Sequence, residues 1–231
     1  MREGILDAEL LFGKAPARDE VYSEGTNVRQ ARGWDPEHFA RQQIRSMVRK
    51  VFFSSVERPV RQIVFNALEP ETDVRDICRQ VGEDLAMESG ASIALVFQDA
   101  GDTPTERTKT TAADASEPLR QVASRLRNNL WQLPNAGQIL GASDLLLSYL
   151  AQVRREFEYS IVEGPPAGKS HEATMMAQYA DGVILVLSAH RTRRVMARKI
   201  KQALEGARAR ILGTVLSDRV FPIPEGIYRR L

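Results

Sequence analysis

Residues 157–166 read FEYSIVEGPP, a stretch that joins an apolar run to an acidic residue, a glycine and two prolines. The apolar residues before Glu163 predict a buried strand over 159–163. Glycine and two prolines directly after Glu163 end that strand. Because ligands of parallel sheets bind at the carboxyl ends of the strands, Glu163 is placed where a functional group would lie.

Other segments on both sides of this stretch repeat the pattern of strand followed by helix. Further strands are predicted at 61–67, 93–97, 130–133, 182–188 and 210–216. Helices are predicted over about 36–53, from Thr72 or Asp73 to about 88, and near 117–128, 143–156, 171–179 and 192–206. Strands that alternate with helices predict a three-layer α/β fold, in which a mainly parallel sheet is covered by helices on both faces.

The chain has 231 residues, enough for one large domain, predicted over 35–231, after a flexible polar arm over 1–34. A net charge of +2 implies no strong polyanion-binding field, so no nucleic-acid partner is expected. The single cysteine, Cys78, excludes an internal disulfide and is expected in the core. With no apolar run of about 18 residues and no signal pattern, we expect a cytoplasmic protein without a membrane span.

Five segments together resemble one known family. They are residues 52–59, 129–134, 157–166, 180–186 and 212–216. In order and spacing they are similar to the cytoplasmic kinase domain of bacterial tyrosine kinases of the polysaccharide co-polymerase type (CpsD/CapB-like), a branch of the MinD/ParA-type P-loop ATPases. The resemblance covers roughly residues 37–231. It implies a P-loop fold, ATP and magnesium as cofactors of an active member, and a role in exopolysaccharide synthesis or export.

In this family the phosphate-binding loop should follow the strand 61–67. Such a loop needs glycines, whose backbone N–H groups wrap the phosphates, and a lysine and a hydroxyl residue. Residues 67–76 read ALEPETDVRD and contain neither glycine nor lysine. Thr72 and Arg75 are the vestigial candidates for cofactor binding: counted from the strand Asp73 stands in the lysine position, and counted from the helix end Arg75 does. The motif is predicted to be degenerate, an ordinary acidic helix start.

The acidic residues that would hold magnesium are also altered. The family strand that ends in Asp-x-Asp here ends at Phe97 and Asp99, so that only the second acid is kept. The distal Walker aspartate is replaced by Glu163, whose side chain is one methylene longer. Asp99 and Glu163 are therefore vestigial catalytic candidates, and no metal site is predicted.

A second loop, over 164–170, reads GPPAGKS and ends like a P-loop. Its spacing is one residue short of the motif, and two prolines remove N–H groups. Gly168, Lys169 and Ser170 remain candidates for binding an anion at the start of the next helix. A plain helix-start loop is the alternative.

The ring-forming and tyrosine motifs of the family are reduced as well. Of the ring motif only Arg45 remains, since Gln42 and Val48 take the other positions. In place of a C-terminal tyrosine cluster the tail holds one residue, Tyr228, and whether it is phosphorylated stays open.

These features favour a catalytically degenerate relative that acts as a regulatory or binding component of exopolysaccharide synthesis, with no cofactor. Its expected partner is a membrane polysaccharide co-polymerase or a related kinase, which would hold it at the inner membrane. The alternative is an active ATP- and magnesium-dependent autokinase with an altered site. A third hypothesis is an unrelated module that keeps only the fold. The oligomeric state and the polysaccharide are left open.

Overall fold

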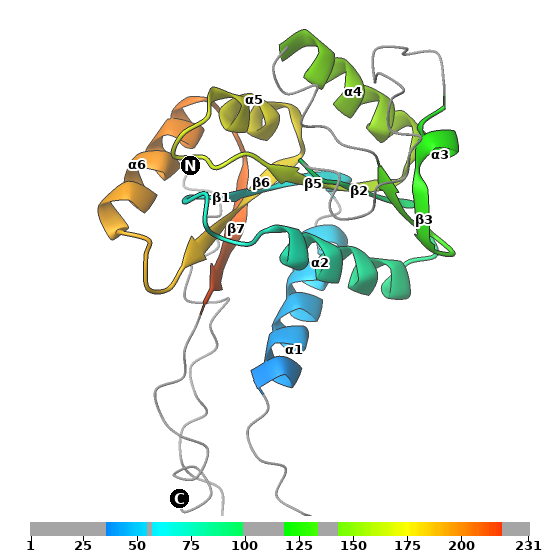
Figure 1. Cartoon of the computed structure of the whole chain (residues 1–231), viewed down its shortest axis with the longest axis horizontal. Helices are drawn as coiled ribbons and strands as arrows, with labels where there is room; N and C mark the ends of the chain where they lie inside the picture. Colours follow the sequence, from blue (N-terminus) through cyan, green and yellow to red (C-terminus); the bar gives the residue numbers. More distant parts are fainter. Residues whose placement is uncertain (1–35, 55–56, 99–117, 134–142, 219–231) are drawn as a thin grey trace, which may run out of the picture.

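The computed structural model describes residues 36–54, 57–98, 118–133 and 143–218 (Figure 1). The elements in chain order are α1 (Pro36–Val48), the π-helical turn η2 (Arg49–Phe53), β1 (Gln62–Ala67), α2 (Arg75–Glu88), β2 (Ile93–Val96), α3 (Leu119–Val122), β3 (Ser124–Arg127), β4 (Leu130–Leu133), α4 (Ser143–Glu156), β5 (Tyr159–Gly164), α5 (His171–Tyr179), β6 (Gly182–Ser188), α6 (Arg194–Gly206) and β7 (Ile211–Ser217).

The strands form one seven-stranded sheet in the order β3-β4-β2-β5-β1-β6-β7. All neighbouring strands are parallel except β3 and β4. Phe65 of β1 lies opposite Glu163 of β5, and Val96 of β2 lies opposite Val162. The carboxyl ends of β1, β2 and β5 therefore meet at one edge. The predicted three-layer α/β fold is confirmed.

Helices cover both faces of the sheet, with α1 and α2 on one side and α4, α5 and α6 on the other (Figure 1). Alternate residues of β1 serve the two cores. Ile63 and Phe65 pack with α1 and α2, whereas Val64 packs with α4. All three side chains are fully buried. Burial of such a side chain contributes about 1.5–3 kcal/mol, so the sheet is firmly held between its helical layers.

The prediction of a helix near 117–128 is wrong. Only Leu119–Val122 are helical, and Ser124–Arg127 form β3, which pairs with β4 in antiparallel orientation. The guanidinium of Arg125 lies 5.7 Å from the ring centre of Trp131 on β4. Pairing with an open sheet edge and this cation–π contact outweigh the weak helix preference of the segment.

The helix predicted to run to Phe53 ends differently, because its last five residues form η2. Phe52 is buried in the core and Phe53 is exposed. The predictions for the arm 1–34, Asp99 and Tyr228 lie outside the described residues.

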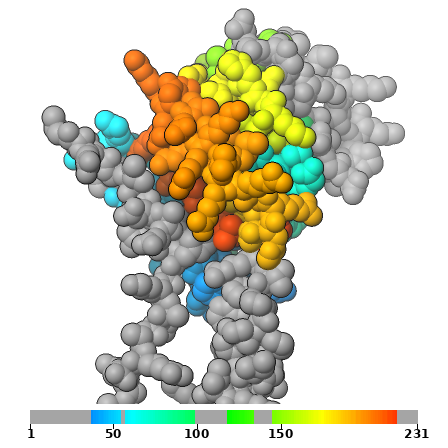
Figure 2. Space-filling model, turned by 90° about the vertical axis from the view of Figure 1, so that its left-hand side faces the viewer, coloured from blue at the N-terminus to red at the C-terminus, as the bar shows by residue number. Residues whose placement is uncertain are grey.

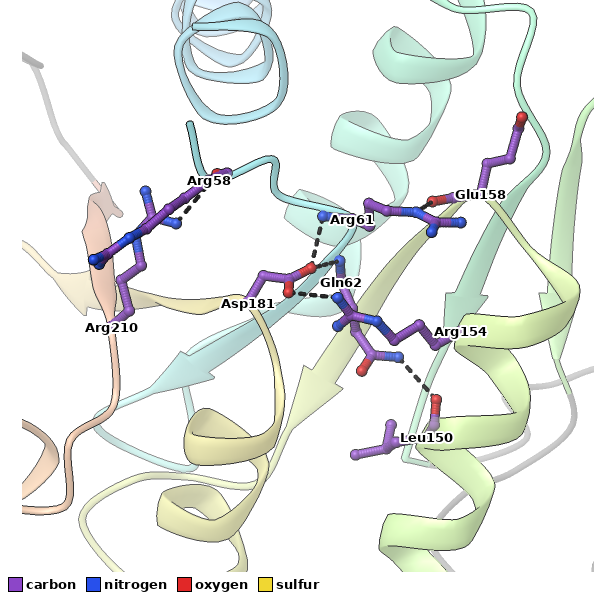
Figure 3. A network of polar contacts seen from close by, with 8 residues as sticks. All are labelled: Arg58, Arg61, Gln62, Leu150, Arg154, Glu158, Asp181 and Arg210. Atoms are coloured by element: carbon purple, nitrogen blue, oxygen red, sulfur yellow. Dashed lines mark hydrogen bonds and ion pairs between the residues drawn. The ribbon is translucent and has the colours of Figure 1, made fainter. Parts of the chain in front are cut away.

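A polar network ties the strand ends together at the opposite, amino edge of the sheet (Figure 3). The carboxylate of Asp181 accepts hydrogen bonds from the backbone N–H groups of Arg61 (2.7 Å) and Gln62 (2.8 Å) and from the guanidinium of Arg154 (2.7 Å). The Gln62 amide donates to the Leu150 carbonyl at 3.2 Å. The side chain of Asp181 thus joins the start of β1 to the start of β6 and to α4, and its role is structural.

Candidate functional site at the carboxyl edge of the sheet

The candidate site is formed by the segments that follow β1, β2, β5 and β6. Two backbone hydrogen bonds fix the loop after β1 against its neighbours. The N–H of Leu68 donates to the Val186 carbonyl on β6 at 3.2 Å, and the N–H of Ala167 donates to the Ala67 carbonyl at 2.8 Å. The loops after β1 and β5 therefore lie in direct contact, at the edge where parallel sheets bind ligands.

The acidic groups of the loop after β1 have structural hydrogen bonds. Glu69 accepts a bond from the hydroxyl of Thr192 at 2.7 Å, and Thr192 in turn accepts one from the Ser188 N–H at 2.9 Å. Asp73 accepts a bond from the N–H of Asp76 at 3.3 Å, in the manner of a helix cap. These contacts support the interpretation of this loop as an acidic start of α2.

Arg75 and Glu163 meet at the centre of the site. The guanidinium lies 3.5 Å from the carboxylate, and the two side chains are 36% and 17% exposed. The Arg75 guanidinium also lies 5.2 Å from the ring centre of Phe97. The backbone N–H of Gln98 donates to the same Glu163 oxygen at 3.2 Å. The two candidate residues Glu163 and Arg75 thus bind each other.

Cys78 lies on α2 close to this pair and is fully buried, which confirms its prediction as a core residue. Burial raises the pKa of its thiol well above the ordinary value. The nearby carboxylates of Glu163 and Asp73 raise the pKa further, and Arg75 opposes them. The sulfur stays a neutral thiol at physiological pH, so it is unsuited to nucleophilic chemistry.

The loop with Gly168, Lys169 and Ser170 uses part of its backbone for hydrogen bonds within the protein. The N–H of Lys169 is engaged by the Pro166 carbonyl at 3.1 Å, and the N–H of Ala167 bonds to β1. The hydroxyl of Ser170 donates to the carboxylate of Glu172, and this bond lowers the pKa of Glu172. The Lys169 side chain is exposed. Two backbone donors of this loop, the N–H groups of Ala167 and Lys169, are therefore already used.

Gly168 nevertheless lies against the loop after β1. A side-chain β-carbon at Gly168 would lie 2.9 Å from the backbone oxygen of Leu68, so only glycine fits this close approach. Lys169 is therefore carried beside the loop after β1, near the place where the phosphates of a P-loop nucleotide would lie.

The sequence interpretation missed four buried polar atoms near the ends of these strands. They are Asn66 Oδ1, Thr72 Oγ1, Gln98 Nε2 and Ser188 Oγ, and in the described structure none has a hydrogen-bond partner. Buried polar groups are normally paired, so such a cluster is a place for water or a polar ligand. Three of them stand at or just beyond strand ends, a position that the sequence pattern could have singled out.

Close packing in the same region explains why residue 164 is a glycine. The side-chain amide of Asn66 donates to the Pro165 carbonyl at 2.7 Å. A β-carbon at Gly164 would lie only 2.3 Å from that amide nitrogen. The glycine thus lets the end of β5 pack against the end of β1.

Among the described residues, no group of three or more His, Cys, Asp or Glu side chains is arranged to hold a metal ion. The same part of the chain has no helix that is long and apolar enough to cross a membrane.

Comparison with known proteins agrees with the predicted resemblance. No family model matches the chain. Over 65 residues it is 34% identical to the tyrosine-protein kinase CpsD of Streptococcus agalactiae serotype III, and the match covers 28% of each protein. In structure it is similar to the kinase domain of VpsO, with a TM-score of 0.61 and 18% identity, covering 80% of this chain and 98% of that one.

The chain has the fold of the bacterial tyrosine kinases. It is similar to the kinase domain of the Escherichia coli tyrosine kinase ETK, with a TM-score of 0.59 and 14% identity, covering 80% of this chain and 79% of that one. The chimerical protein CapA2B2 is also similar, with a TM-score of 0.62 and 17% identity, covering 76% of this chain and 83% of that one. MinD of Aquifex aeolicus shares the same fold more distantly, with a TM-score of 0.51 and 14% identity, covering 74% of this chain and 72% of MinD. The resemblance to bacterial tyrosine kinases of the MinD/ParA type is confirmed.

Proposed function

We propose that this protein is a catalytically degenerate bacterial tyrosine kinase-like protein, a pseudoenzyme that serves as a regulatory or binding component of exopolysaccharide synthesis and export. The observation that carries the proposal is the ion pair between Arg75 and Glu163. In this pair Glu163, the residue at the distal Walker position, is bound by the guanidinium of Arg75 from the same chain. In an active site of this type, that acid would instead order magnesium or the nucleophile.

The backbone of the loop after β1 supports the proposal. A phosphate loop presents several free N–H groups to the nucleotide. Here the N–H of Leu68 is bonded to Val186, that of Thr72 is bonded to Glu69 at 3.3 Å, and Pro70 has none. Three positions of this loop therefore offer no free N–H group to a triphosphate.

Charge acts in the same direction. Glu69, Glu71 and Asp73 all belong to this loop. At about 4 Å, two unit charges in a medium with an effective dielectric constant of about 20 repel each other by roughly 4 kcal/mol. A nucleoside triphosphate bound at this loop would lie next to carboxylates at the place where a conventional P-loop has a lysine.

The process and the partner rest on the relatives. CpsD is named a tyrosine-protein kinase, and VpsO contributes a kinase domain. The expected partner is a membrane polysaccharide co-polymerase or a related kinase, with this protein on the cytoplasmic side of the inner membrane. The match to CpsD spans 28% of that protein, so the process and the partner are proposals for this chain.

The proposal is tested by calorimetric titration of the full chain with ATP and magnesium. Wild type, Arg75→Ala and Glu163→Gln are expected to show no binding in the micromolar range, because the backbone cradle is absent in all three. Arg155→Ala, which changes an exposed residue on α4, serves as a control for unspecific charge effects. Micromolar binding by the wild type would overturn the proposal.

One observation favours a second candidate, an active ATP-dependent tyrosine autokinase with an altered site. Lys169 is exposed on a loop that touches Leu68, so its ammonium group is available beside the loop after β1. If ATP binds and Lys169→Ala abolishes binding, the loop at 164–170 is the nucleotide site. If ATP binding survives in Lys169→Ala but is lost in Arg75→Ala, then Arg75 takes the place of the P-loop lysine that binds the phosphates. Mass spectrometry of Tyr228 after incubation with ATP would then report autophosphorylation.

A further inference from the structure

Positive charge is concentrated around α6. Residues 190–210 contain eight basic side chains and one acidic side chain, Glu205. The basic residues are Arg191, Arg193, Arg194, Arg198, Lys199, Lys201, Arg208 and Arg210. The whole chain has a net charge of only +2, from 32 basic and 30 acidic residues. Outside this segment there remain 24 basic and 29 acidic residues, so the charge of the protein is strongly asymmetric.

The orientation of α6 directs much of this charge to solvent. Ile200 and Leu204 are buried and fix the inner side of the helix against β6. On the opposite side Val195 is 79% exposed, and Arg198 follows it by one helical turn. Met196 lies one turn before the buried Ile200 and is 44% exposed. Figure 2 shows the side chains of α6, in orange, spread over this face of the molecule.

Few of the charges are paired. Lys201 forms an ion pair with Glu205 at 3.6 Å within α6. In the described part of the chain, no acidic side chain pairs with Arg194, Arg198 or Lys199. Arg193 and Arg194 stand at the first turn of α6, where the helix dipole disfavours positive charge. Helix stability therefore does not account for the cluster.

We propose that this α6 surface binds anionic lipid headgroups at a membrane. The surface is defined by Arg191, Arg194, Val195, Met196, Arg198 and Lys199. Basic helices that lie in the membrane interface combine Lys and Arg with exposed apolar side chains, which enter the headgroup region. A surface that only binds nucleic acid has no use for the exposed Val195 and Met196. The proposal goes beyond the proposed function and does not depend on the loss of catalysis.

The test is co-sedimentation of the full chain with vesicles. One set is pure phosphatidylcholine, and the other contains about 30% phosphatidylglycerol, which supplies the negative surface potential. Binding is expected only with phosphatidylglycerol at about 0.1 M salt. It should weaken strongly at about 0.5 M salt, where charges are screened over a shorter distance. Absence of binding to the anionic vesicles at low salt, or equal binding to both sets, would overturn the proposal.

Two variants divide the surface into its charged and apolar parts. Arg194→Gln with Arg198→Gln removes two charges and is expected to weaken vesicle binding about 25-fold, at about fivefold for each charge. Val195→Ser is expected to weaken it about fivefold, because a serine does not enter the interface. Arg41→Gln with Arg155→Gln removes the same charge from α1 and α4 and should change binding less than twofold.

Circular dichroism and thermal melting show whether each variant keeps the wild-type fold. If a variant does not fold, the lipid and salt dependence of the wild type decides the proposal. A generic double-stranded DNA fragment is the competing ligand. If DNA binds at the same salt more tightly than the vesicles, and Val195→Ser leaves vesicle binding unchanged, the lipid assignment is wrong.

Discussion

Arg75 at the start of α2 lies 3.5 Å from Glu163 on β5, and the two residues are 88 positions apart in the sequence. The pair forms because the carboxyl ends of β1 and β5 are adjacent in the sheet, and the loop after β1 brings α2 back over that edge. An acid that would serve magnesium in a nucleotide site is here held by a guanidinium of the same chain.

The first prediction concerns the strength of this pair. A double-mutant cycle with Arg75→Ala and Glu163→Ala should give a coupling free energy of about 0.5–1 kcal/mol, since Arg75 is partly exposed and solvent screens the attraction. Urea unfolding of the four proteins measures it. A coupling free energy near zero would mean that the ion pair does not stabilise the folded protein.

The second prediction concerns the close packing of β5 on β1. Gly164→Ala places a β-carbon 2.3 Å from the Asn66 amide nitrogen and 2.7 Å from a Val64 methyl group. Since β1 cannot move without disturbing the sheet, unfolding free energy should fall by about 2 kcal/mol or more. Gly206→Ala is the matched control, because nothing lies within 4 Å of its new β-carbon. Chemical denaturation should show no loss of stability for the control, and a harmless Gly164→Ala would refute the packing described.

The third prediction tests the network at the amino edge of the sheet. Asp181→Ala leaves the N–H groups of Arg61 and Gln62 and the guanidinium of Arg154 without their common acceptor. Loss of these bonds is expected to cost about 2–4 kcal/mol. Thermal unfolding should show a lower midpoint than for Glu57→Ala, which removes an exposed carboxylate. Similar midpoints for the two variants would contradict the structural role of Asp181.

The fourth prediction follows from the raised pKa of Cys78. In the unfolded chain the thiol ionises near its ordinary pKa of 9.0, whereas in the folded protein it stays protonated to higher pH. Its contribution is therefore fully present below pH 9 and is lost as the pH rises from 9 toward the pKa of the folded protein. The loss should approach about 1.4 kcal/mol per pH unit.

Urea unfolding of the wild type and of Cys78→Ala between pH 7 and pH 10 isolates this contribution from that of other groups. The stability difference between the two proteins should be constant up to about pH 9 and shrink above it. A constant difference across the whole range would show that the thiol has the same pKa in both states.

Several elements were predicted correctly because their signals are local. The apolar run of β6 and the bounds of α5, from Ser170 before it to the Ala180-Asp181 break after it, match the structure residue for residue. The loss of glycine and lysine between Ala67 and Asp76 is likewise a property of the sequence alone. Patterns of this kind depend only on neighbouring residues along the chain, so they can be read without knowledge of the tertiary structure.

Other features depended on how segments pair and pack against one another. β3 was predicted as helix because Ser124–Arg127 carry no strand pattern of their own, and they become a strand only by pairing with the edge of β4. The partners of Arg75 and Glu69 depend on strand order and register, which no local pattern encodes. Sequence thus determined the elements and the absence of glycine and lysine from the loop after β1. Only the packing of the sheet determined that Arg75 and Glu163 bind one another.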